Sequence, residues 1–185
     1  MPFCRQTAKD RYPMPATFKR LNVRTGPGTR TRGWLSAGPF AISVALGRGG
    51  IRANKREGDG ATPRGRFRLV RLWWRADRGA RPRTLLPTRR ITRHDGWCED
   101  PADRRYNQPI KAPSGDRLWR DDALYDLVIE ISHNTRPRIA RHGSAVFIHV
   151  ARPGFTPTAG CVALSKRRLH LLLSRLGPAT SILIY

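Results

Sequence analysis

The sequence predicts a mainly β fold with few helices. Two observations carry this prediction: short runs rich in Val, Ile and aromatic residues recur between Gly, Pro and Asn, and one segment alone has a clear helical period. A length of 185 residues with 39% hydrophobic residues suits one domain with a sizeable core. We expect residues 17–185 to form this single domain, after a loose, polar segment over residues 1–16.

Strand-like runs occur along most of the chain. They cover residues 17–23, 40–46, 67–73, 126–132, 145–150 and 181–185. Glycine-containing turns are expected at 47–50 and 58–60. Neither turn leads into a helical pattern, so a phosphate-binding loop is not expected.

The helix is predicted near the C-terminal end of the chain. Ser165 is a suitable N-cap, and Gly177 followed by Pro178 ends the pattern. Between them, leucines at i, i+3, i+4 and i+7 form an apolar stripe, namely Leu169, Leu172, Leu173 and Leu176. We expect this stripe to lie in the core.

Residues 75–124 form a long stretch of Arg, Pro, Asp and Trp with little periodicity. A connection of this length inside a compact domain is usually functional or disordered. Trp97, Tyr106 and Trp119 favour order. We interpret the stretch as a loop-rich insertion that folds over the domain beside the active site.

The chain is strongly basic, with 36 Lys and Arg against 13 Asp and Glu and a net charge of +23. Such a charge attracts nucleic acid, anionic lipid or an acidic cell-wall polymer, or simply forms a solvated surface. No aromatic-rich RNA motif, zinc finger or recognition helix accompanies the charge, so no obligatory nucleic-acid partner is expected. The sequence shows neither a signal peptide nor the ~20 apolar residues of a membrane span.

One histidine and one cysteine carry the strongest chemical signal. His149 lies on a strand-like run, and Cys161 follows Gly160 after a loop rich in Pro, Gly and Thr. A cysteine attacks as the thiolate, and a nearby imidazole is a common base for it. Gly160 allows a tight corner, and the N–H groups around it are suited to an oxyanion. The alternative interpretation is a buried core cysteine beside an unrelated histidine.

Two segments resemble the L,D-transpeptidase catalytic domain, the YkuD family. The first is Thr158-Ala-Gly-Cys-Val162 preceded by His149, which is similar to the family's histidine, spacer and Ser/Thr-any-Gly-Cys signature. The second is Thr62-Pro-Arg-Gly-Arg-Phe67, which resembles its Thr-Pro-x-Gly-x-Phe element. The resemblance covers roughly residues 40–70 and 126–185. It implies a YkuD-type β-sandwich or barrel.

The resemblance also implies an activity. Cys161 would form a thioester with a diaminopimelate-containing peptidoglycan stem peptide, His149 would act as base, and Gly160 would frame the oxyanion hole. Transfer to the amine of a second stem would form a 3-3 or 1-3 cross-link. Transfer to water would make the same site a carboxypeptidase or endopeptidase. The implied enzyme works as a monomer without cofactor or metal, is acylated by carbapenems and acts in the periplasm or cell envelope.

Three positions depart from the family pattern. Val150 follows the histidine where Gly is common, Ala159 replaces a common His, and Ala163 replaces a common Arg or Asn. These differences concern the shape and substrate contacts of the pocket rather than the thiol chemistry. They indicate a divergent, short subfamily.

Further residues are predicted to contact the substrate. The set is Thr158, Arg138, Arg141, His133, Asn134 and Tyr106. The guanidinium groups would bind carboxylates, although the arginines, His133 and Asn134 also suit ordinary turns. A zinc site built from the histidines and Cys161 matches no standard spacing. Cys98 has acidic neighbours that would raise its thiol pKa, so a structural role is expected.

Overall fold

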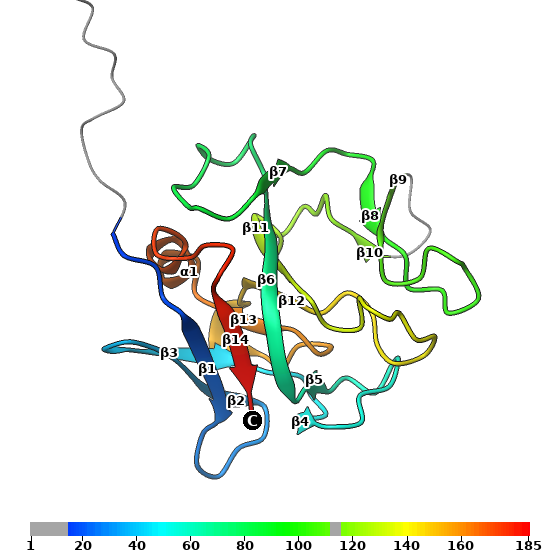
Figure 1. The fold of residues 1–185 in the computed structure, drawn as a ribbon, viewed down its shortest axis with the longest axis horizontal. Coiled ribbons are helices and arrows are strands. Elements are labelled where there is room, and N and C mark those ends of the chain that lie inside the picture. Colours follow the sequence, from blue (N-terminus) through cyan, green and yellow to red (C-terminus); the bar gives the residue numbers. More distant parts are fainter. Residues whose placement is uncertain (1–14, 112–115) are drawn as a thin grey trace, which may run out of the picture.

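The computed structural model describes residues 15–111 and 116–185, so residues 1–14 of the predicted loose segment lie outside the described part. Its main sheet has nine strands in the order β11-β12-β13-β3-β2-β1-β14-β6-β7. An additional pairing of β11 with β6 closes eight of them into a barrel-like ring (Figure 1). The predicted mainly β fold is confirmed.

The strands of the main sheet are short, as the runs of Val, Ile and aromatic residues predict. Their bounds are β1 Arg20–Thr25, β2 Arg32–Ala37, β3 Phe40–Ala45, β6 Gly65–Trp74, β7 Thr88–Arg90, β11 Leu127–Ile131, β12 Phe147–Val150, β13 Val162–Leu164 and β14 Ser181–Ile184. Each of the six predicted runs overlaps one strand. Strands β2, β7 and β13 were not predicted. The buried positions of β2 alternate in the structure, but its residue types do not, and β7 and β13 are only three residues long.

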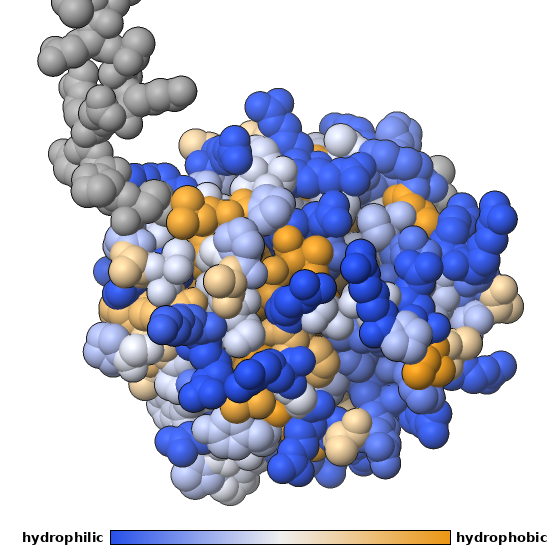
Figure 2. Space-filling view, in the orientation of Figure 1, coloured by the Kyte–Doolittle hydropathy of each residue, from blue (hydrophilic) through white to orange (hydrophobic). Residues whose placement is uncertain are grey.

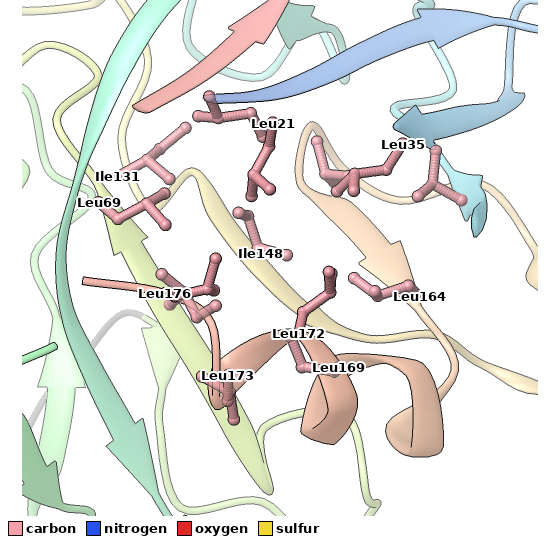
Figure 3. Packing of buried hydrophobic residues seen from close by; sticks show 14 of the residues in the cluster. Leu21, Leu35, Leu69, Ile131, Ile148, Leu164, Leu169, Leu172, Leu173 and Leu176 are labelled. Atoms are coloured by element: carbon pink, nitrogen blue, oxygen red, sulfur yellow. The ribbon is translucent and has the colours of Figure 1, made fainter. Parts of the chain in front are cut away.

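The described part of the chain has one α-helix, α1 Lys166–Leu173, and a short 3₁₀ helix, Pro153–Phe155. The Ser165 side chain accepts a hydrogen bond from the Arg168 N–H, which confirms the predicted N-cap. The predicted leucine stripe is buried and faces the barrel strands, as Figure 3 shows for Leu172 beside Ile148 and Leu164. Burial of this stripe, rather than helix propensity, holds the short helix in place.

Alternation along β12 sends its side chains to two separate clusters. Ile148 and Val150 point into the main core with the α1 leucines. Phe147 belongs to a second cluster on the other face, with Trp73, Trp97 and Cys161. The candidate site therefore lies on the outer face of the barrel sheet.

The described parts of the 75–124 stretch, residues 75–111 and 116–124, cover this outer face. They contain β7 and a small sheet in the order β10-β8-β9, which Figure 1 shows to one side of the barrel. Its strands are β8 Asp95–Trp97, β9 Pro109–Lys111 and β10 Asp116–Arg117. Trp97 and Leu118 bury against Phe147, so the second cluster joins this stretch to the barrel.

Elsewhere, β4 Ile51–Arg52 pairs in parallel with β5 Thr62–Pro63. The visible face in Figure 2 is mostly hydrophilic, with apolar patches between the polar side chains. Within the described residues, no helix is long and apolar enough to cross a membrane.

Candidate active site

The pairing of β12 with β13 places His149 and Cys161 on one face. The strands are parallel, with Ile148 opposite Val162 and His149 opposite Ala163. Side chains alternate along a strand, so His149, Ala163 and the preceding Cys161 all face outward. Both functional side chains line a single cavity of about 700 Å³. The structure thus brings the predicted nucleophile and base together.

The backbone determines the protonation of His149. Its Nδ1 lies 2.8 Å from the Val150 carbonyl oxygen, which can only accept a hydrogen bond. Nδ1 therefore carries the proton, and Nε2 is left as the basic nitrogen. Burial lowers the pKa of His149 to about 4, so the imidazole is neutral near pH 7. The edge of the Tyr125 ring lies against the imidazole, with centroids 5.4 Å apart.

The Cys161 thiol is held by two backbone groups. Sγ donates to the Ala145 carbonyl at 3.3 Å and accepts from the Phe147 N–H at 3.3 Å. Burial raises the pKa of Cys161 to about 12, although the Phe147 N–H lowers it. Among the described contacts, the hydrogen-bond partners of the thiol are these backbone groups and not the imidazole. With these pKa values, both the thiol and the imidazole are neutral near pH 7.

Thr158 shapes the corner before the cysteine. Its hydroxyl donates to the Cys161 carbonyl at 2.7 Å and accepts from the Gly160 N–H at 3.1 Å. Gly160 has φ +142°, and a Cβ there would lie 2.8 Å from the Ala61 carbonyl oxygen. Glycine is therefore required at this corner. Thr158 acts as a brace, and its hydroxyl occupies the Gly160 N–H that we expected to frame the oxyanion.

The Thr62-Pro63 element supports the Thr158–Cys161 corner through the segment 46–48. The Thr62 hydroxyl accepts from the Gly47 N–H at 2.8 Å. The flanking residues Leu46 and Arg48 exchange backbone hydrogen bonds with Thr158, each 2.9 Å long. Both sequence motifs therefore meet, since Thr62 positions the segment on which Thr158 rests.

A residue of the 75–124 stretch fixes the carbonyl that holds the thiol. The Asn107 side chain accepts from the Ala145 N–H at 3.1 Å and from Trp97 Nε1 at 2.9 Å. Its amide donates to the carbonyls of His133 and Asn134. Ala145 itself has φ +50°, an unfavourable conformation for a residue with a Cβ. These contacts hold Ala145 in the conformation that directs its carbonyl at Sγ.

The cavity wall carries both signs of charge. Acidic and basic side chains contribute to it, namely Glu57, Glu99, Asp116, Arg48, Lys55, Arg120 and Arg152. Burial and the neighbouring Asp116 and Glu57 raise the pKa of Glu99 to about 7, even though its side chain reaches solvent. Asp116 accepts a hydrogen bond of 2.8 Å from the Tyr125 hydroxyl. Glu99 and Asp116 belong to the 75–124 stretch, so that stretch forms part of the site.

Five predicted substrate-contacting residues lie outside the lining of this cavity. They are Arg138, Arg141, His133, Asn134 and Tyr106. The Asn134 amide is engaged by the Ile139 and Gly143 backbone, and the His133 ring by the His142 carbonyl. Tyr106 donates to Glu57, which does line the cavity. Their roles in substrate binding stay predictions.

Sequence reasoning missed several residues of the site. Lys55, Glu57, Tyr125 and Ala145 all line the cavity. Lys55 and Glu57 lie just before the Thr-Pro element, and Tyr125 lies just before a predicted strand. These sequence positions do not indicate that the side chains point into the cavity. Within the described residues, no group of three or more His, Cys, Asp or Glu side chains could hold a metal ion.

The profile of the YkuD family, described as the L,D-transpeptidase catalytic domain, matches residues 18–184. The chain belongs to the YkuD family. The resemblance expected from the two motifs is thereby confirmed over nearly the whole chain. The three departures fall where the structure can accommodate them, because Ala159 and Ala163 line the cavity while Val150 packs in the core.

A solved structure similar to this YkuD chain is an L,D-transpeptidase from Mycobacterium smegmatis. The two share 12% identity with a TM-score of 0.41, over 89% of this chain and 58% of the other. The chain thus spans little more than half the length of that protein. No curated protein matches the chain significantly.

Proposed function

We propose that this YkuD chain is a peptidoglycan L,D-transpeptidase with Cys161 as its nucleophile. One observation carries the proposal: the Cys161 thiol and an imidazole with a free basic Nε2 lie on one sheet face and line one cavity. Acyl transfer through a cysteine requires this combination of groups. The substrate is a stem peptide that contains diaminopimelate, and the chain acts in the periplasm or cell envelope as a monomer.

In the first half of the reaction, the donor stem acylates Cys161, and His149 transfers the thiol proton to the leaving group. His149 Nε2 accepts that proton as Sγ attacks the carbonyl carbon of the diaminopimelate residue. The backbone N–H of Cys161 is the proposed donor to the oxyanion, because the Gly160 N–H is bound to Thr158. The imidazolium then gives its proton to the departing D-amino acid, and a thioester with Cys161 remains.

In the second half of the reaction, an acceptor amine takes the acyl group and frees Cys161. The amine of a second stem attacks the thioester carbonyl, His149 takes its proton, and the Cys161 thiolate leaves and is reprotonated. The product is an amide cross-link of the 3-3 or 1-3 type. Water in place of the amine gives a shortened stem instead, which is the carboxypeptidase or endopeptidase alternative.

Carbapenem acylation tests the nucleophile. A carbapenem incubated with the purified chain should leave one acyl group on Cys161, as peptide mass spectrometry would show. The adduct should be absent in Cys161→Ala, slower in His149→Ala and unchanged in the control Cys98→Ala. A wild-type chain that stays unmodified, or that is acylated on Cys98, contradicts the proposal.

Incubation with purified muropeptides then identifies the acceptor. Cross-linked dimers that disappear in Cys161→Ala support transfer. Shortened monomers alone would replace the transferase with the hydrolase. Salt-sensitive DNA binding that survives Cys161→Ala, without any acylation, would favour a basic binding module instead.

A further inference from the structure

A buried lysine lines the same cavity as the proposed nucleophile and has no role in the mechanism above. Lys55 is 7% exposed and lines the same cavity as Cys161. Burying an ammonium group is unfavourable unless it is paired. Lys55 lies in the loop between β4 and β5, which leads to the Thr-Pro element.

Two glycines form the slot through which the Lys55 side chain passes. A Cβ at Gly143 would lie 2.9 Å from both Cγ and Cε of Lys55, and a Cβ at Gly160 would lie 3.5 Å from Cε. Gly160 directly precedes Cys161, and Gly143 lies two residues before Ala145. Cys161 carries Sγ and Ala145 supplies the carbonyl that holds it. The lysine therefore runs between the two backbone segments that position the thiol.

The end of the side chain is fixed inside its own loop. Nζ donates to Asp59 Oδ1 at 2.7 Å and to the Arg56 carbonyl at 3.0 Å. Asp59 also accepts from the N–H groups of Arg56 and Ala61, each at 2.8 Å. The charge of Lys55 is thus held at a defined place, which is the condition for a preorganised electrostatic effect.

Arg48, Arg120 and Arg152 also line the cavity, but Lys55 is the cation among the three charged groups with the largest effect on the Cys161 thiol. Asp116 and Glu99 face it from the 75–124 stretch, and both raise its pKa. Tyr125, Glu57 and the neutral imidazole of His149 line the same cavity. The Lys55 ammonium acts in the opposite direction and lowers the pKa of Cys161.

We propose that Lys55 is a positioning residue whose buried ammonium stabilises the negative charge that develops on Cys161 Sγ when the proton leaves. The proposal rests on the proposed function in taking Cys161 as the nucleophile. Lys55 does not touch the substrate and acts through the sulfur. Its side chain also holds the slot between Gly143 and Gly160, so a test must separate charge from shape.

The test is the rate of alkylation of Cys161 by iodoacetamide, measured from pH 7 to pH 9 by peptide mass spectrometry. Lys55→Met keeps the length and apolar stem but removes the charge. Because alkylation follows the thiolate fraction, the rate at Cys161 should fall about tenfold at each pH. A purely structural role predicts the reverse, since a loosened slot exposes the thiol and speeds alkylation.

Two controls accompany this variant. Cys98 reports on the same molecules and should keep its rate, and Lys19→Met removes an exposed charge and should leave Cys161 unchanged. If Lys55→Met does not fold, Lys55→Met with Asp59→Asn leaves no unpaired charge and should still slow Cys161 several-fold. A folded single or double variant whose Cys161 reacts at the wild-type rate or faster overturns the proposal. Alkylation needs neither stem peptide nor acyl transfer, so the outcome is independent of whether the proposed function holds.

Discussion

At the scale of single residues, the site combines two groups that are each neutral at rest. Burial shifts both pKa values away from the charged form, lowering that of His149 to about 4 and raising that of Cys161 to about 12. A thiolate–imidazolium pair is therefore not present before substrate binds. In the reaction proposed above, the proton leaves the thiol as Sγ attacks the carbonyl, so we expect Nε2 of His149 to be essential for acyl transfer.

The buried imidazole makes folding stability depend on pH. The folded pKa of His149 is about 4 and the unfolded value about 6.5, so the unfolded chain takes up the proton first as pH falls. The stability is fully present above pH 6.5 and is lost as pH falls from 6.5 to 4. Between these limits, urea unfolding should show a loss of about 3 kcal/mol that is absent in His149→Gln.

The comparison of wild type with His149→Gln cancels other titrating groups. His133 has a similarly lowered pKa, and Glu99 has a raised pKa that acts in the opposite direction, but both are present in each protein. The difference in unfolding free energy between the two proteins should therefore follow His149 alone. Parallel stability profiles from pH 7 to pH 4 would contradict the buried, neutral imidazole.

At the scale of elements, the Asn107 side chain connects the 75–124 stretch to the proposed nucleophile. Asn107 bonds the Ala145 N–H, and the Ala145 carbonyl accepts from Sγ. The same side chain bonds Trp97, which packs on Phe147. The stretch thus covers the site and also determines where the thiol points.

Asn107→Ala tests this connection. The substitution leaves the buried Trp97 Nε1 and Ala145 N–H without their acceptor, at about 1–3 kcal/mol for each buried donor. We expect lower stability in urea and slower acylation of Cys161 by a carbapenem. Gln108→Ala is the matched control, because that side chain makes a single hydrogen bond of 3.5 Å to Arg104 and should change neither quantity. If Asn107→Ala and Gln108→Ala change stability and acylation rate equally, the Asn107 side chain does not connect the 75–124 stretch to Cys161.

The elements also show what the sequence could and could not predict. Six of the eight barrel strands and the helix follow from local patterns, because alternation and the leucine stripe reflect burial within each segment. Strand β13 was not predicted, since three residues carry no period and its pairing with β12 is set by the tertiary fold. Glu99 and Asp116 were not predicted for the same reason, as only the folded β10-β8-β9 sheet brings them to the cavity.

At the scale of the whole molecule, the net charge of +23 is a property of the surface more than of the site. The cavity contains three acidic side chains as well as basic ones, whereas the chain as a whole has far more basic residues than acidic. If the chain acts on peptidoglycan as proposed, we expect the excess positive charge to serve association with an anionic cell-wall polymer, and the mixed cavity to bind the stem peptide itself.

These two contributions respond differently to salt. Association through many exposed cations weakens steeply with ionic strength, because counterions compete for the polymer. Reaction on insoluble peptidoglycan should therefore fall about tenfold or more between 50 mM and 300 mM NaCl. Reaction on a soluble muropeptide of low charge should change by less than about twofold, since its contacts are short-range and partly buried. Product formation on both substrates, measured with one enzyme preparation, checks this difference.

A carbapenem acylation rate that stays constant over the same salt range is the control for the integrity of the site. If salt inhibits both substrates equally, the surface charge acts within the cavity rather than through the polymer.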